Sequence, residues 1–370
     1  MANKLKILII DPFHAGSHAY WSSSMKREWS ARANVEITLL TLPGRHWKWR
    51  MQGSSAEFAH TCATITAPPD AIICTDMLDV SSFRGLLRAD WRRIPVIQYF
   101  HENQITYPWS PDDPDVKNGR DRTYGMMNIL SAMASDALWF NSEFHRKRFL
   151  AAIPEFLHPF PDGIRAYNEH QFDKKSTVLP LGINAAVTAD CKRPCREAPT
   201  ILWNHRWEFD KAPDYFRNVL LDFKMHKMPF SLILTGEQFD SIPSPLLLIQ
   251  EEFHQEILHQ GYAKSREEYH ALLERSDFVI HSPKQEYFGI SVLEAMSKGV
   301  IPLLGEGTAY EDWCDESFIT SSPSMIRERF RSYAANPAPH RKLAKQIPQQ
   351  FDWDNVIPLY IEATNEVVNS

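Results

Sequence analysis

The sequence has no apolar run of the ~20 residues that a membrane-spanning helix requires. Its N-terminus, MANKLKILIID, leads directly into a short apolar segment that ends at Asp11, which predicts a buried first strand rather than a signal peptide. Its five cysteines are few and odd in number, which is typical of reduced thiols in the cytoplasm. We therefore expect a globular, cytoplasmic protein without disulfide bonds.

Several motifs for cofactors and metals are also missing. No G-x-G-x-x-G follows a predicted strand, which argues against a nicotinamide oxidoreductase, and no G-x-x-x-x-G-K-[ST] indicates a P-loop kinase. Cys191 and Cys195 have no second Cys or His pair nearby, so we expect a linker there rather than a metal site. Asp112, Asp113 and Asp115 lie in a proline-rich loop and are interpreted as turn residues rather than a metal-binding carboxylate pair.

The composition is that of a protein with two domains. The 370 residues are 44% hydrophobic, enough for two cores in domains of roughly 150–200 residues each. The net charge of −6 is unevenly spread: residues 1–150 hold 18 Lys and Arg against 15 Asp and Glu, and residues 151–370 hold 22 against 31. This asymmetry suggests that the two halves bind different ligands.

Short apolar strands alternate with helical segments along the whole chain, which predicts an α/β fold with two doubly wound, Rossmann-like domains that face a central cleft. The polar, proline-containing stretch NAAVTADCKRPCREAP interrupts this alternation. We accordingly predict an acceptor-binding domain over 1–184, a linker over 185–199, a donor-binding domain over 200–352 and a closing amphipathic helix over 353–370. Ligands of such open sheets bind at the carboxyl ends of the strands.

The most specific segment of the chain is HSPKQEYFGISVLEAMSKG in the second half. A predicted strand leads into a loop with Glu286, then to Gly289, and then to a helix with Glu294. Gly289 lets the backbone approach a ligand, and the free amides of the first helical turn form an anion site. Either glutamate alone is explained by an ordinary acid beside a core helix, but the combined spacing favours a site for a nucleotide sugar.

A second segment, LWNHRWEFDKAP, places Arg206 and Lys211 after the first strand of the predicted donor domain. Two cations there can neutralise a diphosphate leaving group. The alternative is a pair of surface cations that form ion pairs with Glu208 and Asp210.

Polar side chains also follow the strands of the first half. YFHENQITYPW supplies His101, Glu102 and Asn103 at the end of one strand, which suits an acceptor site, although a buried core histidine would also explain His101. DPFHAGSH supplies candidate residues His14, Gly16 and His18 after the first strand, but a single glycine is weak evidence for a phosphate turn.

The stretch LPGRHWKWRMQG follows the second strand and alternates cations with tryptophans. Such a pattern can stack bases and bind phosphates, or it can be a packed loop at the edge of the sheet. We expect Arg45, Lys48 and Arg50 to contact RNA together with Trp49, with Trp47 or Trp49 packed beneath the cations.

The run EYFGISVLEA, Glu286–Ala295, resembles the E-x7-E signature of retaining GT-B glycosyltransferases of family four. The resemblance implies that Glu286 lies near the transferred hexose and that Glu294 binds the nucleotide ribose. It also implies that Arg206 and Lys211 hold the donor diphosphate. The remaining donor contacts are expected from the loop and helix start, at Phe288, Gly289, Ile290 and Ser291.

Together with ILIIDPFHAGSH, TLPGRHWKWRMQG, YFHENQITYP and FNSEFHRKRFL, these segments resemble the queuosine-tRNA mannosyltransferase family over essentially the whole chain. The resemblance implies metal-independent transfer of mannose from GDP-mannose to queuosine of tRNA-Asp, with His101 lining the sugar site. Where family-four enzymes often have two glycines after the first strand, Ala15 precedes Gly16 here. This difference puts donor contacts at Gly16 in doubt.

Two other functions fit parts of the sequence. A family-four glycosyltransferase acting on a lipid or polysaccharide would need a basic or aromatic amphipathic face on the first domain, for which MKREWSARA is the one candidate. A non-catalytic module that binds a nucleotide sugar or RNA would be expected to lack Glu286 or Lys211, yet both are present.

Overall fold

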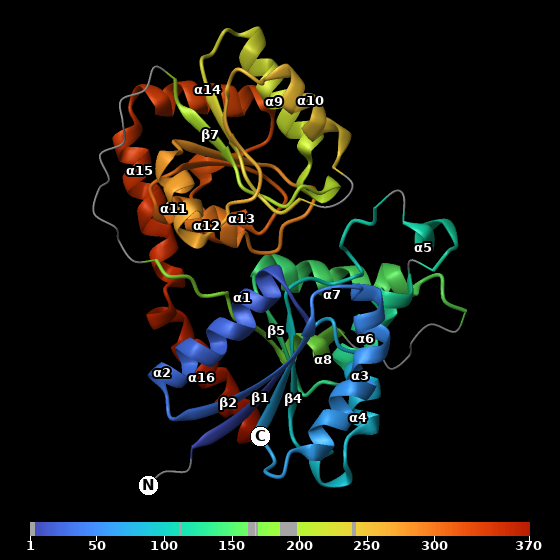
Figure 1. Cartoon of the computed structure of the whole chain (residues 1–370). Coiled ribbons are helices and arrows are strands. Elements are labelled where there is room, and N and C mark those ends of the chain that lie inside the picture. The colour runs from blue at the N-terminus through green and yellow to red at the C-terminus, as the bar shows by residue number, and fades with distance from the viewer. Residues whose placement is uncertain are drawn as a thin grey trace. The chain divides into compact units, whose positions relative to one another are not determined.

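The computed structural model describes residues 4–110, 113–120, 122–161, 167, 169–185, 198–238 and 242–370. The chain divides into two compact units, one made of Met1–Gly182 with Trp353–Ser370 and the other of Ile183–Asp352 (Figure 1). Each unit has a six-stranded parallel sheet covered by helices, which confirms the predicted α/β class with two Rossmann-like domains. Most of the expected linker, including Cys191 and Cys195, lies outside the described residues, as does Asp112.

The first sheet has the strand order β2-β1-β3-β4-β5-β6, with every neighbouring pair parallel. Three of its four inner strands, β3, β4 and β5, are buried along their whole length, as expected for a sheet with helices on both faces. The strands are β1 Leu5–His14, β2 Val35–Pro43, β3 Ala71–Thr75, β4 Val96–Phe100, β5 Ala137–Phe140 and β6 Ser176–Val178.

The helices of the first unit include one from the far end of the chain. Helix α16, Trp353–Val368, packs on the first unit, where the Trp21 indole donates to the Tyr360 hydroxyl at 2.9 Å and that hydroxyl donates to the Leu179 carbonyl at 3.3 Å. The others are α1 Gly16–Ser24, η1 Met25–Trp29, α2 Ser30–Arg32, α3 Trp47–Thr64, α4 Val80–Leu86, η2 Ala89–Trp91, α5 Pro114–Lys117, α6 Arg122–Ala134, α7 Glu143–Leu157 and α8 Glu169–Lys174.

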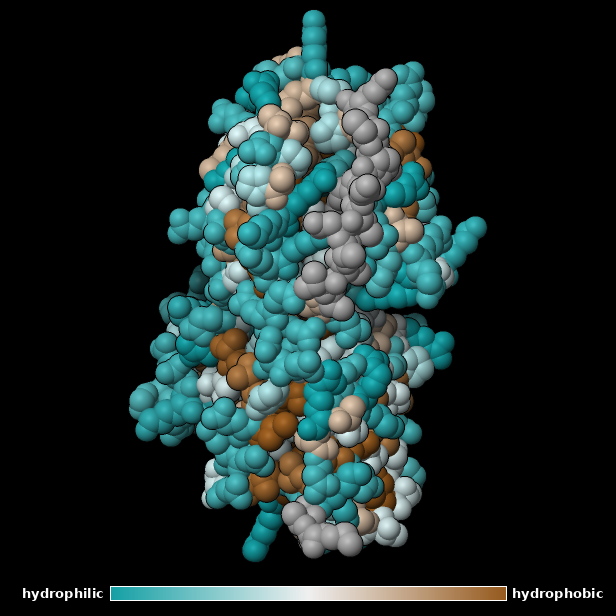
Figure 2. Space-filling model, turned by 90° about the vertical axis from the view of Figure 1, so that its left-hand side faces the viewer, coloured by the Kyte–Doolittle hydropathy of each residue, from teal (hydrophilic) through white to brown (hydrophobic). Residues whose placement is uncertain are grey.

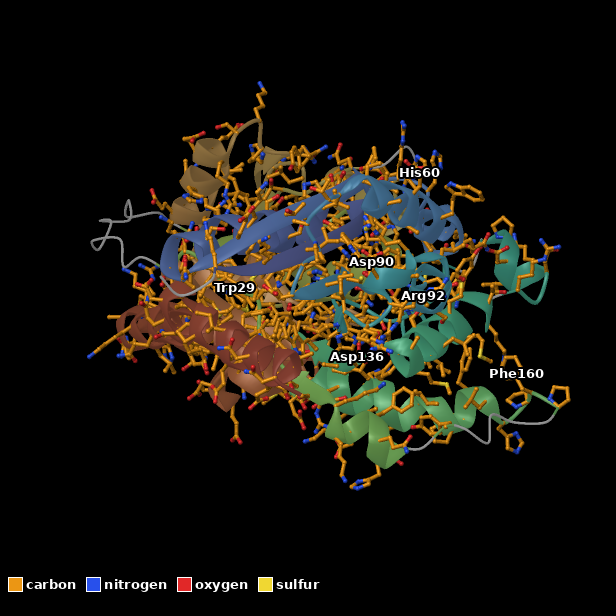
Figure 3. All side chains as sticks on the ribbon, turned by 90° about the horizontal axis from the view of Figure 1, so that it is seen from below. Trp29, His60, Asp90, Arg92, Asp136 and Phe160 are labelled. Atoms are coloured by element: carbon orange, nitrogen blue, oxygen red, sulfur yellow. The ribbon has the colours of Figure 1, made fainter. Side chains whose placement is uncertain are left out.

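Trp29 and Asp136, both labelled in Figure 3, make structural contacts in the first unit. Trp29 lies between the first strands and α16, with its ring 6.3 Å from that of Tyr360. Asp136 precedes β5 and accepts from the Val96 amide at 2.7 Å, and its carboxylate also pairs with Arg84. The contacts of Asp136 stabilise the amino ends of β4 and β5.

The packed loop, one of the two interpretations of GRHWKWR, describes only its first residues. Helix α3 begins at Trp47, directly after His46, whose backbone is left-handed with φ 56°. No Ser, Thr, Asp or Asn precedes the helix, and no side chain caps it. The usual start signal is therefore missing from the sequence. As a result, residues 47–50 form a first helical turn, in which neighbouring side chains point to different faces.

The second sheet has the order β12-β11-β10-β7-β8-β9, again with parallel pairs throughout. Its strands are β7 Thr200–Trp203, β8 Ser231–Leu234, β9 Ile257–Gln260, β10 Phe278–His281, β11 Ile301–Gly305 and β12 Ile319–Thr320. Its helices are η3 Phe209–Lys211, α9 Pro213–Met225, α10 Ser244–Glu252, α11 Arg266–Arg275, α12 Ile290–Ser297, α13 Tyr310–Trp313, η4 Glu316–Phe318, α14 Pro323–Ala335, α15 Pro337–Gln346 and η5 Ile347–Phe351.

The order of this sheet positions the site. Strands β7 and β10 are neighbours in the centre, and all four residues of each are buried. Because parallel strands end at the same edge, the segments after Trp203 and after His281 emerge side by side. On the face shown in Figure 2, apolar residues are more frequent over the first unit than over the second.

Candidate active site

The loops after β7 and β10 bring Lys211 and Glu286 into contact. Lys211 ends η3, and its Nζ lies 3.2 Å from Glu286 Oε2 and 3.3 Å from Asp210 Oδ2. Its side chain is only 13% exposed. Burial by itself lowers the pKa of Lys211, but the two carboxylates outweigh burial and raise it, so the ammonium group keeps its charge.

Arg206 lies on the same loop, with Nη2 3.1 Å from Glu208 Oε2. Its side chain is 41% exposed. Burial raises the pKa of Glu208, although Arg206 acts in the opposite direction. The structure therefore contains the ion pairs that the sequence offered as an alternative, but both cations lie on one loop, and Lys211 is held against Glu286.

Gly289 forms the sharp entry into α12, with φ 92°. A Cβ atom at this position would lie 2.3 Å from Tyr310 Cε1, so the turn has room only for glycine. The Glu286 Oε1 atom accepts from the Phe288 amide at 3.4 Å, and the Trp313 indole donates to the Phe288 carbonyl at 3.0 Å. The loop is therefore fixed on both sides of the helix start, where the amides of Ile290 and Ser291 lie.

Behind the helix start is a buried polar layer. The Asn204 Nδ2 group donates to the Ser291 carbonyl and to the Tyr269 hydroxyl, both at 2.9 Å. The Ser291 hydroxyl lies 3.3 Å from His205 Nδ1, and the His205 ring stacks on His281 with 3.4 Å between centroids. The first turn of α12 is therefore supported from β7 and β10.

Glu294 lies further along α12 and pairs with Arg266 at the start of α11. Its side chain is 15% exposed. Within the second unit, the structure thus groups Lys211, Glu286, Phe288, Gly289 and the first turn of α12, with Glu294 in an ion pair about one turn beyond.

Sequence reasoning missed part of this site. Asp210, which contacts Lys211, is almost completely buried, and His205, His281 and Tyr310 lie behind α12. The sequence feature that could have indicated these residues is the polar segment NHRWEFDK, which directly follows a buried strand. Gly236 belongs here too: with φ 153°, its backbone approaches the His205 carbonyl so closely that a Cβ would lie 1.8 Å from that oxygen.

In the first unit, His14 is held by a buried acid at the end of β1. Its Nδ1 lies 2.8 Å from Asp11 Oδ2, which also accepts from the Ser22 hydroxyl at 2.7 Å. Asp11 is completely buried, whereas the His14 side chain is 29% exposed. Gly16, the first residue of α1, has φ 52° and no heavy atom near the position of a Cβ.

His101 and His18 lie together beneath the carboxyl end of this sheet, with ring centroids 4.2 Å apart. His101 also contacts Trp21 edge-on, and its amide donates to Asp76 Oδ1 at 2.9 Å. Burial, with a further effect from His18 and His145, holds the pKa of His101 well below its usual value. His101 is therefore neutral at physiological pH and only 6% exposed.

The residues after His101 mainly shape their own loop. The Asn103 side-chain oxygen accepts from the amides of Ile105 and Thr106 at 3.1 and 3.0 Å. Glu102 accepts from the Gln104 side chain at 2.9 Å. Each of these side chains therefore makes a contact within its own loop. Their expected role in binding an acceptor remains a prediction.

Helix α3 separates the cations of the tryptophan-rich stretch. Lys48 pairs with Asp113 and Asp115, at 2.5 and 2.6 Å, and its Nζ lies 5.2 Å from the centre of the Trp109 ring. Burial by itself lowers the pKa of Lys48, but its two carboxylate partners raise it. Lys48 therefore fastens the loop at Asp113 to α3.

The other members of this stretch are more accessible. Trp49 is 62% exposed, and Arg45 is exposed as well. The Arg50 guanidinium donates to the Pro43 carbonyl at 3.2 Å. Trp47 packs against Tyr124, with 4.9 Å between ring centroids. Of the two tryptophans, Trp47 is thus the packed one, and Trp49 is available for stacking.

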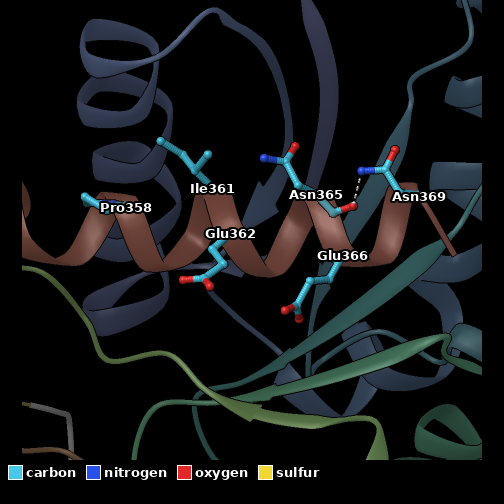
Figure 4. Close-up of a pocket in the computed structure, with 6 residues that line it drawn as sticks. All are labelled: Pro358, Ile361, Glu362, Asn365, Glu366 and Asn369. Atoms are coloured by element: carbon cyan, nitrogen blue, oxygen red, sulfur yellow. Dashed lines mark hydrogen bonds between the residues drawn. The ribbon is translucent and has the colours of Figure 1, made fainter.

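A groove of about 610 Å³ lies elsewhere, along one side of α16 (Figure 4). It is lined by Pro358, Ile361, Glu362, Asn365, Glu366 and Asn369 and contains none of the candidate residues. In the described ranges, no three His, Cys, Asp or Glu side chains are arranged to hold a metal ion. No helix in the described part of the chain has the length and hydropathy needed to cross a bilayer.

Comparisons with known proteins agree with this geometry. Residues 6–183 match the family model "tRNA-queuosine alpha-mannosyltransferase N-terminal", and residues 195–346 match "Glycosyl transferases group 1". The tRNA-queuosine alpha-mannosyltransferase of Drosophila melanogaster is 29% identical over 98% of this chain and 97% of its own length. A GDP-mannose:cellobiosyl-diphosphopolyprenol alpha-mannosyltransferase of Xanthomonas oryzae pv. oryzae (strain PXO99A) is 24% identical over 46% of this chain and 47% of its own.

Solved structures show the same fold at low identity. A sucrose-phosphate synthase from Thermosynechococcus elongatus aligns with a TM-score of 0.72 at 13% identity, over 98% of this chain and 99% of that one. A UDP-forming alpha,alpha-trehalose-phosphate synthase from Burkholderia xenovorans aligns with a TM-score of 0.69 at 12% identity, over 99% and 100%. Together with the site after β7 and β10, the fold defines a glycosyltransferase of the GT-B class.

Within that class the chain is similar to the tRNA-queuosine alpha-mannosyltransferases, with a match to their N-terminal domain followed by a match to a group 1 glycosyltransferase domain. The resemblance inferred from the sequence motifs is thereby confirmed, as is the assignment of the chain to the hexosyltransferases.

Proposed function

We propose that the enzyme transfers a mannosyl group from GDP-mannose to the queuosine nucleoside of tRNA-Asp, with retention at the anomeric carbon. The observation that carries this proposal is the relation to the Drosophila tRNA-queuosine alpha-mannosyltransferase, which extends over 98% of the chain. A similarity limited to the second unit would support sugar transfer without favouring a particular acceptor. Similarity through the first unit supports an acceptor of the same kind.

Two observations support GDP-mannose as the donor. The Xanthomonas relative is named for the same nucleotide sugar, although it matches less than half of the chain. The second unit supplies Lys211, Arg206 and the helix start after Gly289, which suit a diphosphate. In this arrangement Glu286 faces the hexose. Glu294 leaves its ion pair with Arg266 and accepts hydrogen bonds from the ribose hydroxyls instead.

The reaction follows from these positions. The bond between the anomeric carbon and the phosphate oxygen breaks, and the charge that develops on the diphosphate is stabilised by Lys211, Arg206 and the α12 amides. The acceptor hydroxyl forms the new bond on the same face of the sugar, and its proton passes to the departing phosphate oxygen. His101, which is neutral and buried, is assigned to the sugar site on the resemblance to the family.

We also propose that no metal or other cofactor takes part, because side-chain cations and a helix start occupy the role that a divalent ion has at many diphosphate sites. A cytoplasmic location fits this function: Cys62, Cys74 and Cys314 are free thiols, and a tRNA acceptor is found there.

The proposal is tested with GDP-[14C]mannose and two preparations of tRNA-Asp that differ only in whether position 34 carries queuosine or guanosine. We expect label in the queuosine tRNA alone, released as mannose on hydrolysis of the isolated nucleoside. Label in both preparations, or in neither, would contradict the acceptor assignment. UDP-glucose and GDP-glucose serve as competing donors.

One alternative acceptor has an observation in its favour. The Xanthomonas relative is named for a polyprenol-linked acceptor, so transfer to a lipid-linked glycan is the second candidate. Incubation of the enzyme with GDP-[14C]mannose and cellobiosyl-diphosphopolyprenol distinguishes the two, since label in the organic phase would favour the lipid acceptor.

A further inference from the structure

Two histidine rings are stacked beneath the start of α12. His205 follows β7, and His281 is the last residue of β10; their ring centroids are 3.4 Å apart and their planes differ by 17°. Both residues are buried, with 4% and 1% exposure. The pair lies directly behind the helix turn to which we assigned the donor diphosphate.

Hydrogen bonds fix the tautomer of His281, whereas the tautomer of His205 depends on the orientation of the Ser291 hydroxyl. His281 Nδ1 contacts the Tyr310 hydroxyl. Burial, together with Glu286, raises the pKa of Tyr310 well above its usual value, so the phenol stays protonated and donates to His281 Nδ1. His281 therefore carries its proton on Nε2. His205 Nδ1 faces the Ser291 hydroxyl at 3.3 Å, and this hydroxyl can rotate to donate or to accept.

The outer nitrogens of the pair have unused hydrogen-bonding capacity. Among the residues that the structure describes, neither His205 Nε2 nor His281 Nε2 has a hydrogen-bond partner. Such buried, unpaired groups are rare in folded proteins and call for a physical reason. The histidine pair is therefore a polar feature whose hydrogen bonds the protein alone leaves incomplete.

The charges around the pair keep both rings neutral before the donor binds. Burial lowers the pKa of His205 well below its usual value, and Lys211 on η3 adds to this effect. Burial, His205 and Lys211 do the same to His281. The carboxylates of Asp210 and Glu286 lie against Lys211, which balances one of their two charges, and Tyr310 is uncharged.

We propose that His205 takes up a proton when the donor diphosphate binds at the start of α12, and that the Ser291 hydroxyl then turns to donate to the diphosphate. This inference rests on the proposed function, because it assigns the donor to this helix. The proton comes from solvent and binds His205 Nδ1, which then donates to the Ser291 oxygen. The hydroxyl hydrogen of Ser291, which no longer forms a hydrogen bond to His205 Nδ1, then points toward the diphosphate.

Two physical reasons support this coupling. A diphosphate diester brings two negative charges into a poorly solvated region, where they favour the protonated form of a nearby imidazole. The stack limits the uptake to one proton per bound donor, because two imidazolium rings 3.4 Å apart would repel strongly. His281, with its tautomer fixed by Tyr310, remains the neutral partner. His205 thus acts as a positioning residue through Ser291.

Isothermal titration calorimetry of the whole enzyme with GDP-mannose tests this inference. GDP-mannose is a suitable probe because its diphosphate diester does not titrate between pH 5.5 and 8.5. Titrations in buffers of different ionisation enthalpy give the number of protons bound with the donor. We expect net uptake, of up to one proton, at pH 5.5–6.5, and none at pH 8.5. Correspondingly, the dissociation constant should fall with decreasing pH, by up to about tenfold per pH unit.

The variants His205→Asn and Ser291→Ala should still bind GDP-mannose but lose most of the proton uptake and of the pH dependence. His340→Asn is the matched control, since His340 is also stacked, on Tyr333 at 3.7 Å in the same unit, and it should behave like the wild type. Circular dichroism and thermal unfolding show whether each variant is folded. If one variant does not fold, the other variant and the number of protons that the wild type takes up still test the inference.

The possible failures are distinguishable. Binding of GDP-mannose by the wild-type enzyme without proton uptake would overturn this inference and leave the proposed function intact. Uptake that persists in folded His205→Asn would overturn it as well. If neither GDP-mannose nor UDP-glucose binds, the donor assignment itself is wrong, and the inference fails with it.

Discussion

Lys211 combines a structural contact with the chemical role that we propose for it. Its ammonium group lies between Asp210 and Glu286, and both carboxylates keep it charged in spite of burial. Because the ammonium group is already charged, it can bind a third anion, the proposed donor diphosphate, without a change in protonation. Arg206, which is more exposed, adds a second cation from the same loop.

We expect Lys211→Met and Arg206→Ala each to lower the rate of sugar transfer by at least ~10²-fold, the scale of one lost stabiliser of transition-state charge. Single-turnover rates at saturating donor measure this effect. Arg331→Ala, which removes an exposed cation of α14, is the control. A folded Lys211→Met enzyme with a near-normal rate would remove Lys211 from the catalytic site.

We expect the same residues to make the reaction independent of divalent ions. We expect transfer to be unchanged, within about twofold, after dialysis against EDTA, because Lys211, Arg206 and the helix start supply the positive charge at the diphosphate. The rate should also not rise on addition of Mg²⁺ or Mn²⁺. Loss of activity in EDTA that Mn²⁺ restores would show that a metal site has been overlooked.

At the scale of elements, the entry to α12 depends on a glycine. Gly289 has φ 92°, and a Cβ there would lie 2.3 Å from the Tyr310 ring. We expect Gly289→Ala to destabilise the enzyme by about 1–3 kcal/mol, through backbone strain and displacement of Tyr310. Donor affinity should fall at the same time, because the α12 amides shift.

Urea unfolding and donor titration measure the two effects of Gly289→Ala. Gly307→Ala is the control, since Gly307 also has a positive φ of 71° but no heavy atom near the position of a Cβ. Gly307→Ala should destabilise the enzyme through backbone strain alone and leave donor affinity unchanged. Equal loss of donor affinity in both variants would contradict the role of the α12 start.

Helix α3 changes the expectation for RNA binding. Lys48 is engaged by Asp113 and Asp115, whereas Arg45 is exposed and Arg50 contacts only a backbone carbonyl in the described hydrogen bonds. We therefore expect Arg45→Ala with Arg50→Ala to flatten the dependence of log K on log [salt] for tRNA by roughly two units, one for each lost phosphate contact.

Lys48→Ala serves as the comparison for this pair. It should leave the salt dependence almost unchanged and lower the melting temperature, because the loop at Asp113 loses its attachment to α3. Filter binding between 50 and 200 mM salt measures the slopes. Equal slopes for the wild type and the double variant would assign the tRNA phosphates to another surface.

For the whole molecule, buried histidines set the response to acid. Burial is the main cause that lowers the pKa of His101, His145, His205 and His281 well below 6.5. The unfolded chain therefore binds more protons than the folded one below pH 6.5. Their contribution to stability is complete above that pH and is lost as the pH falls from 6.5 toward the folded-state values.

We expect the free energy of unfolding to fall between pH 6.5 and 5 by up to about 1.4 kcal/mol per pH unit for each such histidine. Urea titrations at pH 7.5, 6.5 and 5.5 measure it. His60→Gln, on the exposed side of α3, is a control that should leave the slope unchanged. A stability that is flat across this range would mean that the buried rings titrate normally.

The sequence by itself determined the class of fold and the two-domain pattern, and it singled out Arg206, Lys211, Glu286 and Gly289 as candidate donor residues, because these depend on local signals: buried strands, strand ends and a glycine before a helix. It did not reveal that GRHWKWR begins a helix, since no capping residue marks the start at Trp47. Only the tertiary structure decided which side chains meet. Lys48 lies against Asp113 and Asp115, and His205 lies against His281, because separate chain segments converge at the carboxyl ends of parallel strands. Such long-range pairings are set by strand order and packing, which leave no local pattern in the sequence.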